Sequence, residues 1–183
     1  MIMISHIETV TSLGQLTDLY ADELKAYSME QLTRKPSEDE WSLGQMYVHL
    51  INTALNMQLR NVEICRDRSG ESVTETKGAT EAGQAIFAAG GFPPVRIQVP
   101  PSPQYTPGQP ESKEQLAEGL QTVLRRMKEI SSELESIDPR QTVDHPRLGA
   151  FNANQWFALV EMHFRHHLLQ KKRLQDWLSS SNG

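Results

Sequence analysis

The sequence has one cysteine, no long apolar run and no excess of positive charge, and each of these absences excludes a class of protein. With Cys65 alone among 183 residues, the chain has neither an intrachain disulfide framework nor a thiolate-rich zinc site. No apolar stretch approaches the roughly 20 residues that a membrane-spanning helix needs, so we expect no membrane partner. The formal net charge of −5 argues against nucleic acid as the main partner.

The start of the chain and the overall composition point to an ordinary globular protein. The opening residues, MIMISHIETVTS, lack the basic region and the cleavage site of a secretory signal, so the cytoplasm is the expected location. Hydrophobic residues make up 38% of the chain and charged residues 22%, which is typical of a folded domain. A chain of this length fits one domain, and we expect it to span residues 1–183.

Helix-start signals precede four stretches with apolar residues at 3–4 spacing. In each signal, Ser or Asn stands three residues before Glu or Gln, the pattern of a capping box that satisfies two free backbone N–H groups. The four signals are Ser5-x-x-Glu8, Ser42-x-x-Gln45, Ser112-x-x-Gln115 and Asn152-x-x-Gln155. They predict helices near 5–28, 42–68, 112–136 and 152–180, with Pro36, Pro139 and Pro146 between them as helix stops.

The turn-forming residues gather between the second and third of these helices. Seven of the ten prolines fall within 92–110, and several glycines come just before, which predicts an irregular connection over 69–111 with at most a short helix near 80–89. The joins between helices one and two, and three and four, are shorter and are expected to link antiparallel neighbours. We therefore predict an all-α fold, a four-helix bundle with one long crossover between helices two and three.

Two histidines of the last helix share its core-facing stripe. At 100° per residue, His163 and His167 lie about 20° either side of Trp156, whereas His166 points about 80° away. One core-facing histidine is most often a satisfied interior residue. Burying two of them, one turn apart, removes both imidazoles from water, which is unfavourable. A shared metal ion offsets this desolvation free energy because neutral imidazoles are good ligands.

The second helix offers a third ligand. His49 lies in a polar row beside the apolar stripe of this helix, a row that otherwise reads as a solvated face. If this helix packs beside the last one, His49 meets His163 and His167. Three neutral histidines would leave coordination positions open, as in a catalytic metal site.

Other residues are candidates for supporting roles. Gln45, Thr53 and Gln170 could hydrogen-bond the ligands, and His145 could line the mouth of the site. The sequence assigns no catalytic residue and no general base. In particular, His163 is followed by Phe, so the HExxH pattern of metalloproteases is missing.

The segments WSLGQMYVHLINT and HPRLGAFNANQWFALVEMHFRHHLLQKKRL resemble the DinB-like superfamily, also called damage-inducible or YfiT-like. The shared pattern is W-S-x-x-Q-x-x-x-H-L followed by H-x-x-H-H-x-x-Q, and the resemblance covers nearly the whole chain from about residue 36. It implies a four-helix bundle with an unusual helix order and a divalent metal held by His49, His163 and His167. It also implies a small-molecule substrate and a homodimer, which is common in the group.

Two functions follow from this resemblance and remain open on the sequence. Members of the superfamily include transferases and isomerases that use low-molecular-weight thiols, and metal-dependent hydrolases, so the chain could activate a thiol or a water molecule. Alternatively, the metal could be structural or sensory in a protein without catalysis. The sequence does not choose among Zn, Ni and Fe, since all three accept imidazole.

Overall fold

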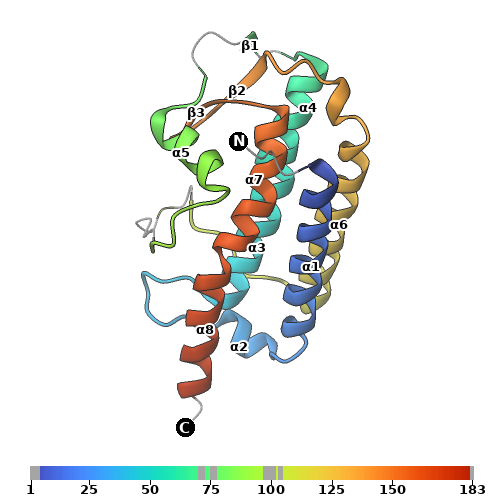
Figure 1. Cartoon of the computed structure of the whole chain (residues 1–183). Coiled ribbons are helices and arrows are strands. Elements are labelled where there is room, and N and C mark those ends of the chain that lie inside the picture. The colour runs from blue at the N-terminus through green and yellow to red at the C-terminus, as the bar shows by residue number, and fades with distance from the viewer. Residues whose placement is uncertain (1–4, 70–72, 75–77, 97–101, 103–104, 182–183) are drawn as a thin grey trace.

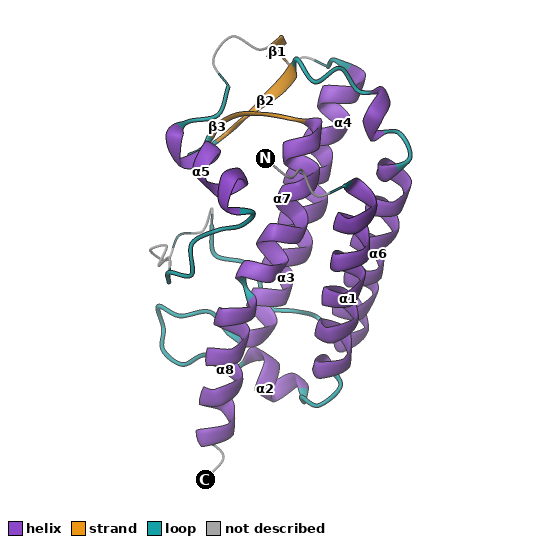
Figure 2. Cartoon of the chain, in the orientation of Figure 1, coloured by secondary structure: helices purple, strands orange, loops and turns teal. Residues whose placement is uncertain are grey.

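The computed structural model describes residues 5–69, 73–74, 78–96, 102 and 105–181. Helices make up most of this part of the chain (Figures 1 and 2). They are α1 His6–Leu24, α2 Met29–Thr33, α3 Leu43–Thr53, α4 Arg60–Asp67, α5 Glu81–Ala89, α6 Lys113–Ser131, α7 Ala153–His166 and α8 Leu168–Ser180. The expected helical fold is confirmed.

Four long rods form the bundle: α1, the α3–α4 pair, α6 and the α7–α8 pair. The close neighbours of α1 are α6 and α7, and the α3–α4 rod likewise packs against α6 and α7. The α1 helix therefore lies diagonal to the α3–α4 rod, and α6 lies diagonal to the α7–α8 rod. The expectation that the shorter joins link neighbours is wrong. The physical reason is that these joins carry elements of their own, α2 at one end and a hairpin at the other, which cross the ends of the bundle (Figure 1).

The predicted helix starts are confirmed. Ser5, Ser42 and Asn152 each form a complete capping box, and the Ser112 side chain accepts a hydrogen bond from the Gln115 backbone N–H. A further box, Ser28 with Gln31, starts α2. The first helix, predicted near 5–28, ends earlier, at Leu24.

The other three predicted helices are also interrupted or shortened. A π-helical segment, η1 (Ala54–Leu59), separates α3 from α4 within the predicted 42–68 helix. The predicted 152–180 helix breaks at His167, close to the point where the Tyr20 hydroxyl donates to the Phe164 carbonyl oxygen. The 112–136 helix ends at Ser131, and a 3₁₀ turn, η2 (Leu134–Ser136), follows.

A small sheet at one end of the bundle was not predicted. Strands β2 (Gln141–His145) and β3 (Gly149–Asn152) form an antiparallel hairpin, and β1 (Val73–Thr74) pairs with β2 (Figure 2). The crossover docks on this hairpin, since Thr80 N–H donates to the Leu148 carbonyl. From there α5, the short helix expected near 80–89, leads the chain back toward α7 (Figure 1).

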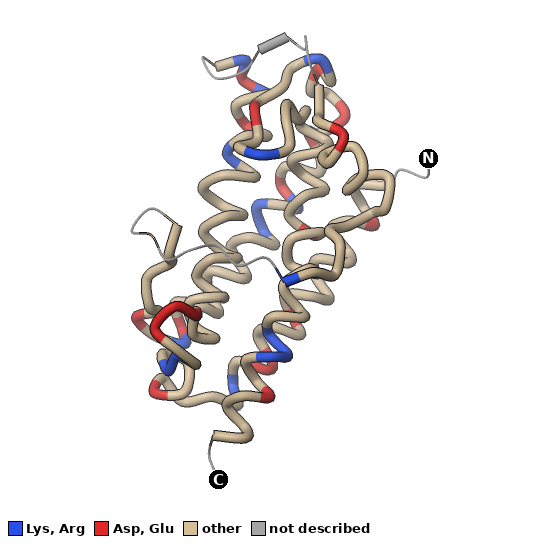
Figure 3. The backbone as a smooth tube through the Cα atoms, turned by 90° about the vertical axis from the view of Figure 1, so that its left-hand side faces the viewer, with Lys and Arg blue, Asp and Glu red and all other residues tan. Residues whose placement is uncertain are grey.

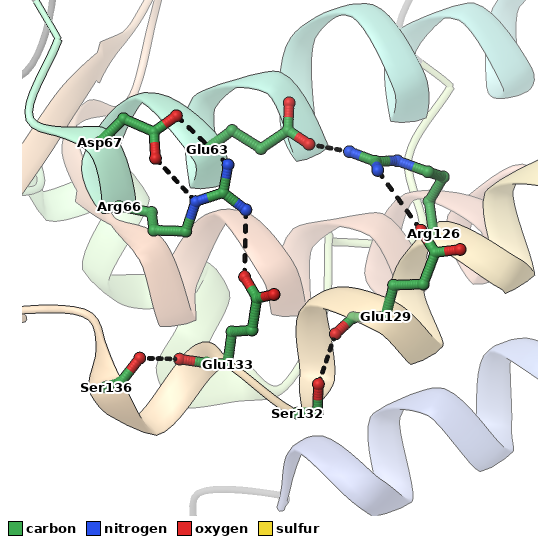
Figure 4. Close-up of polar contacts among 8 residues, drawn as sticks. All are labelled: Glu63, Arg66, Asp67, Arg126, Glu129, Ser132, Glu133 and Ser136. Atoms are coloured by element: carbon green, nitrogen blue, oxygen red, sulfur yellow. Dashed lines mark hydrogen bonds and ion pairs between the residues drawn. The ribbon is translucent and has the colours of Figure 1, made fainter.

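The rods are tied together by a continuous apolar core and by peripheral ion pairs. Inside, the Tyr47 hydroxyl donates to the Tyr20 carbonyl, which links α3 to α1 across the bundle. Outside, Arg66 of α4 pairs with Glu133 at 3.0 Å, and Arg126 of α6 pairs with Glu63 (Figure 4). Basic and acidic residues are interspersed along the backbone in the view of Figure 3.

Candidate metal centre

Three histidines from two rods converge at one point of the bundle. His49 belongs to α3, His163 to α7, and His167 lies at the junction of α7 and α8. The Nε2 atom of His163 lies 3.0 Å from Nε2 of His49 and 3.0 Å from Nε2 of His167. The structure thus brings together the three residues that the sequence proposed as ligands.

The local sequence explains how each ring reaches this point. The spacing of four residues between His163 and His167 puts both on one face, and the backbone bond from His167 N–H to the His163 carbonyl, 3.1 Å, keeps the helical turn between them. Because α4 and η1 pack along α7, and α3 packs along α8, the third imidazole enters from the neighbouring rod. These contacts join positions 114 residues apart in the chain.

Burial keeps the three imidazoles neutral. Loss of water lowers the pKa of His49 to about 3, and repulsion from His167 adds to this effect. The same burial lowers the pKa of His167 to about 4, although its bond to Gln170 acts in the opposite direction. Burial, reinforced by the neighbouring histidines, lowers the pKa of His163 as well. Neutral rings with free nitrogen lone pairs are the form that binds a metal.

The outer nitrogens of the three rings have different partners. Nδ1 of His167 lies 2.7 Å from Oε1 of Gln170, and Nδ1 of His49 lies 3.4 Å from the Thr53 hydroxyl. Nδ1 of His163 is buried and has no hydrogen-bond partner among the described residues. Two of the expected supporting residues therefore contact the ligands.

The other two supporting candidates take different contacts. The Gln45 amide accepts from the Ser42 N–H and donates to the Pro107 carbonyl at 2.7 Å, so it fastens the end of the crossover to α3. The His145 ring stacks on Trp156 at 5.5 Å, and its Nδ1 accepts from a backbone N–H within its own turn.

Two half-buried aromatic rings beside the histidines were not anticipated as site residues. The Trp41 ring centre lies 4.9 Å from that of His49. Phe92, from the crossover, lies 6.4 Å from His163 and 5.3 Å from His166. Trp41 stands eight residues before His49 in the quoted motif, a spacing that could have flagged it, whereas nothing in the sequence brings Phe92 to this place.

A hydrogen bond from Arg165 holds the segment that carries Phe92. Arg165 of α7 donates to the Gly90 carbonyl at 2.7 Å and pairs with the buried carboxylate of Glu161. Glu161 also accepts a hydrogen bond from Ser12 of α1 at 2.8 Å. The wall of the site is therefore anchored to two rods.

The donor set fits a divalent metal ion. In the described part of the chain, the group of histidine, cysteine and acidic side chains that could hold an ion consists of His49, His163 and His167, whose ligand atoms lie within 4.8 Å of one another. Three imidazole nitrogens suit Zn, Ni or Fe better than a hard cation such as Mg²⁺, which prefers oxygen ligands. Three protein ligands also leave at least one coordination position for another molecule.

No helix in the described ranges has the length and apolar character needed to cross a bilayer.

Comparison with known proteins identifies the family of this chain. The chain is 24% identical over 157 residues to the "Uncharacterized protein YuaE" of Bacillus subtilis (strain 168), which covers 85% of this chain and 90% of that protein. The family model of the DinB superfamily matches residues 12–170, and this range contains all three clustered histidines. The chain belongs to the DinB superfamily.

Proposed function

We propose that the protein is a metal-dependent enzyme in which His49, His163 and His167 hold a divalent ion. The observation that carries the proposal is the convergence of three neutral imidazoles, in which Nε2 of His163 lies 3.0 Å from Nε2 of both His49 and His167. The group of possible ligands among the described residues contains no fourth side chain. A divalent ion bound there would act as a Lewis acid that lowers the pKa of a thiol or water molecule toward neutrality.

The proposed reaction is transfer of a low-molecular-weight thiol to a small electrophile, or hydrolysis of a small ester or amide. The superfamily supports the first choice, because thiol-dependent transferases occur in it. The chain's own residues contribute in two ways. Thr53 and Gln170 orient ligand rings, and the half-buried rings of Trp41 and Phe92 offer apolar surface to the body of a substrate.

The test combines metal binding with turnover. The purified protein is stripped with a chelator, reloaded with Zn, Ni or Fe, and assayed with a panel of thiols paired with electrophiles and a panel of esters. We expect one equivalent of metal per chain in the wild type, none in His163→Ala, and turnover that needs both metal and His163. Failure of the wild type to retain metal would refute the proposal.

A second candidate is a protein in which the metal has a structural or sensory role without catalysis. It is favoured by one observation: the three ligands join α3 to the α7–α8 junction, so a bound ion would fasten two rods. A ligand at 100 times its dissociation constant adds about 2.7 kcal/mol of stability. A rise in melting temperature with metal, together with no turnover on either panel, would decide for this role.

A further inference from the structure

Among the described residues, Gln170 makes the shortest hydrogen bond to any of the three clustered imidazoles. Its Oε1 atom lies 2.7 Å from Nδ1 of His167. A carbonyl oxygen only accepts hydrogen bonds, so the ring hydrogen must sit on Nδ1 and the lone pair must sit on Nε2. This Nε2 atom is the one that faces His163 at 3.0 Å. The contact therefore fixes the tautomer that a metal ligand requires.

His167 stands between two helices, and Gln170 contacts its ring from the second of them. The α7 helix ends at His166 and α8 begins at Leu168. Gln170 lies in the first turn of α8, so the bond connects the ligand across the break to the next rigid segment.

The other two ligands have weaker outer support. The Thr53 hydroxyl lies 3.4 Å from Nδ1 of His49, which is long for a hydrogen bond, and Nδ1 of His163 has no partner in the described structure. Gln170 is thus the main hydrogen-bonding support of the cluster. It is also uncharged, whereas histidine ligands are commonly supported by a carboxylate.

We propose that Gln170 is the positioning residue of the metal centre, and that its neutral amide leaves the bound ion with its full positive charge, so that the centre takes an anion as its incoming ligand. This inference rests on the proposed metal binding. The three neutral imidazoles and the uncharged Gln170 amide would bring no negative charge to a divalent ion, so an anion such as a thiolate would gain Coulomb attraction there. A carboxylate in place of the amide would keep the hydrogen bond and cancel part of that attraction.

Two substitutions separate orientation from charge. Gln170→Leu removes the acceptor, and we expect Zn²⁺ and Co²⁺ affinity, measured by chelator competition, to fall about 10- to 100-fold. Gln170→Glu restores the acceptor, and we expect metal affinity within a few-fold of wild type. In the cobalt-loaded protein, azide followed by visible absorption is expected to bind at least about threefold more weakly to Gln170→Glu than to the wild type. Gln121→Leu, on the exposed face of α6, is the matched control and should change none of these values.

A measurement without metal covers the case in which a variant binds none. Nitrogen-15 spectra of the metal-free wild type should show His167 protonated at Nδ1, and Gln170→Leu should give a mixture of the two tautomers. Wild-type metal affinity in Gln170→Leu, or an unchanged tautomer, would overturn the positioning role. Unchanged azide affinity in Gln170→Glu would overturn the charge argument. A wild type that binds no metal refutes the proposed function instead, while the spectra still decide the role of Gln170.

Discussion

The stability of the metal-free protein should fall steeply between pH 7 and pH 5, because three imidazoles are held neutral. The pKa of His49 is lowered to about 3 and that of His167 to about 4, in both cases chiefly by burial, and the pKa of His163 is lowered too. The unfolded chain has ordinary histidines with a pKa of about 6.5. Between these values the unfolded state binds more protons, so acid favours unfolding.

The sign and size of the effect follow from linkage. The loss begins as the pH falls through about 6.5, and for His49 it is complete only below about 3, where the folded state is protonated as well. Between pH 7 and pH 5, His49 and His167 each remove about 2 kcal/mol of unfolding free energy, and His163 acts in the same direction. Small domains have about 5–15 kcal/mol in total, so the loss is a large share.

The assay is urea denaturation of chelator-treated protein at pH 7, 6 and 5, with His49→Gln beside the wild type. Carboxyl groups ordinarily have pKa values of about 4, below this window. The pKa of Asp138 is lowered further, to about 2, by hydrogen bonds from Arg140. The His49→Gln variant should lose about 2 kcal/mol less than the wild type over the same range. A wild-type loss below about 1 kcal/mol, or an equal loss in the variant, would refute the reasoning.

Three further changes test the fold around the site. Lys171 is only 4% exposed and pairs with Glu23. Glu23→Ala leaves this buried ammonium without its partner carboxylate and should lower the free energy of unfolding, measured by urea denaturation, by about 3–5 kcal/mol. Lys171→Met should lower it by about 1 kcal/mol. Gly149 has φ +84°, and a Cβ there would lie 2.7 Å from the Thr80 backbone nitrogen of the crossover. Gly149→Ala should therefore lower the free energy of unfolding by about 2 kcal/mol or more. Gly108→Ala, where a Cβ would meet open space, should lower it by less than about 0.5 kcal/mol. Tyr20→Phe removes the hydroxyl that bonds a carbonyl of α7 and should cost about 1–2 kcal/mol, measured in the same way.

Each of these changes has an outcome that contradicts its argument. Equal costs for the Glu23 and Lys171 variants would mean that the buried ammonium finds another partner. A neutral Gly149→Ala would show that the hairpin turn can relax away from the crossover. An unchanged free energy for Tyr20→Phe would show that the hydroxyl contributes no net stabilisation in the core.

The elements that the sequence predicted depend on short-range chemistry. Helix starts at Ser5, Ser42 and Asn152 follow from side chains that bond the backbone three residues away. The missed elements lack such a local code. Strand β2 lies between Pro139 and Pro146, and β3 follows Pro146, in a stretch whose sequence is typical of a gap between helices. The strands form because β2 pairs with both β3 and β1.

The sequence alone determined the four helical rods and the pairing of His163 with His167 on one face, because a helix repeats every 3.6 residues and places positions i and i+4 together. It also named His49 as the partner, but only on the condition that two rods meet. The tertiary structure decided that condition. Packing placed the α3–α4 rod beside the α7–α8 rod and diagonal to α1. It also brought Trp41 and the crossover residue Phe92 against the imidazoles. Contacts between residues more than 100 positions apart arise from how apolar faces are buried together, and no local spacing encodes that choice.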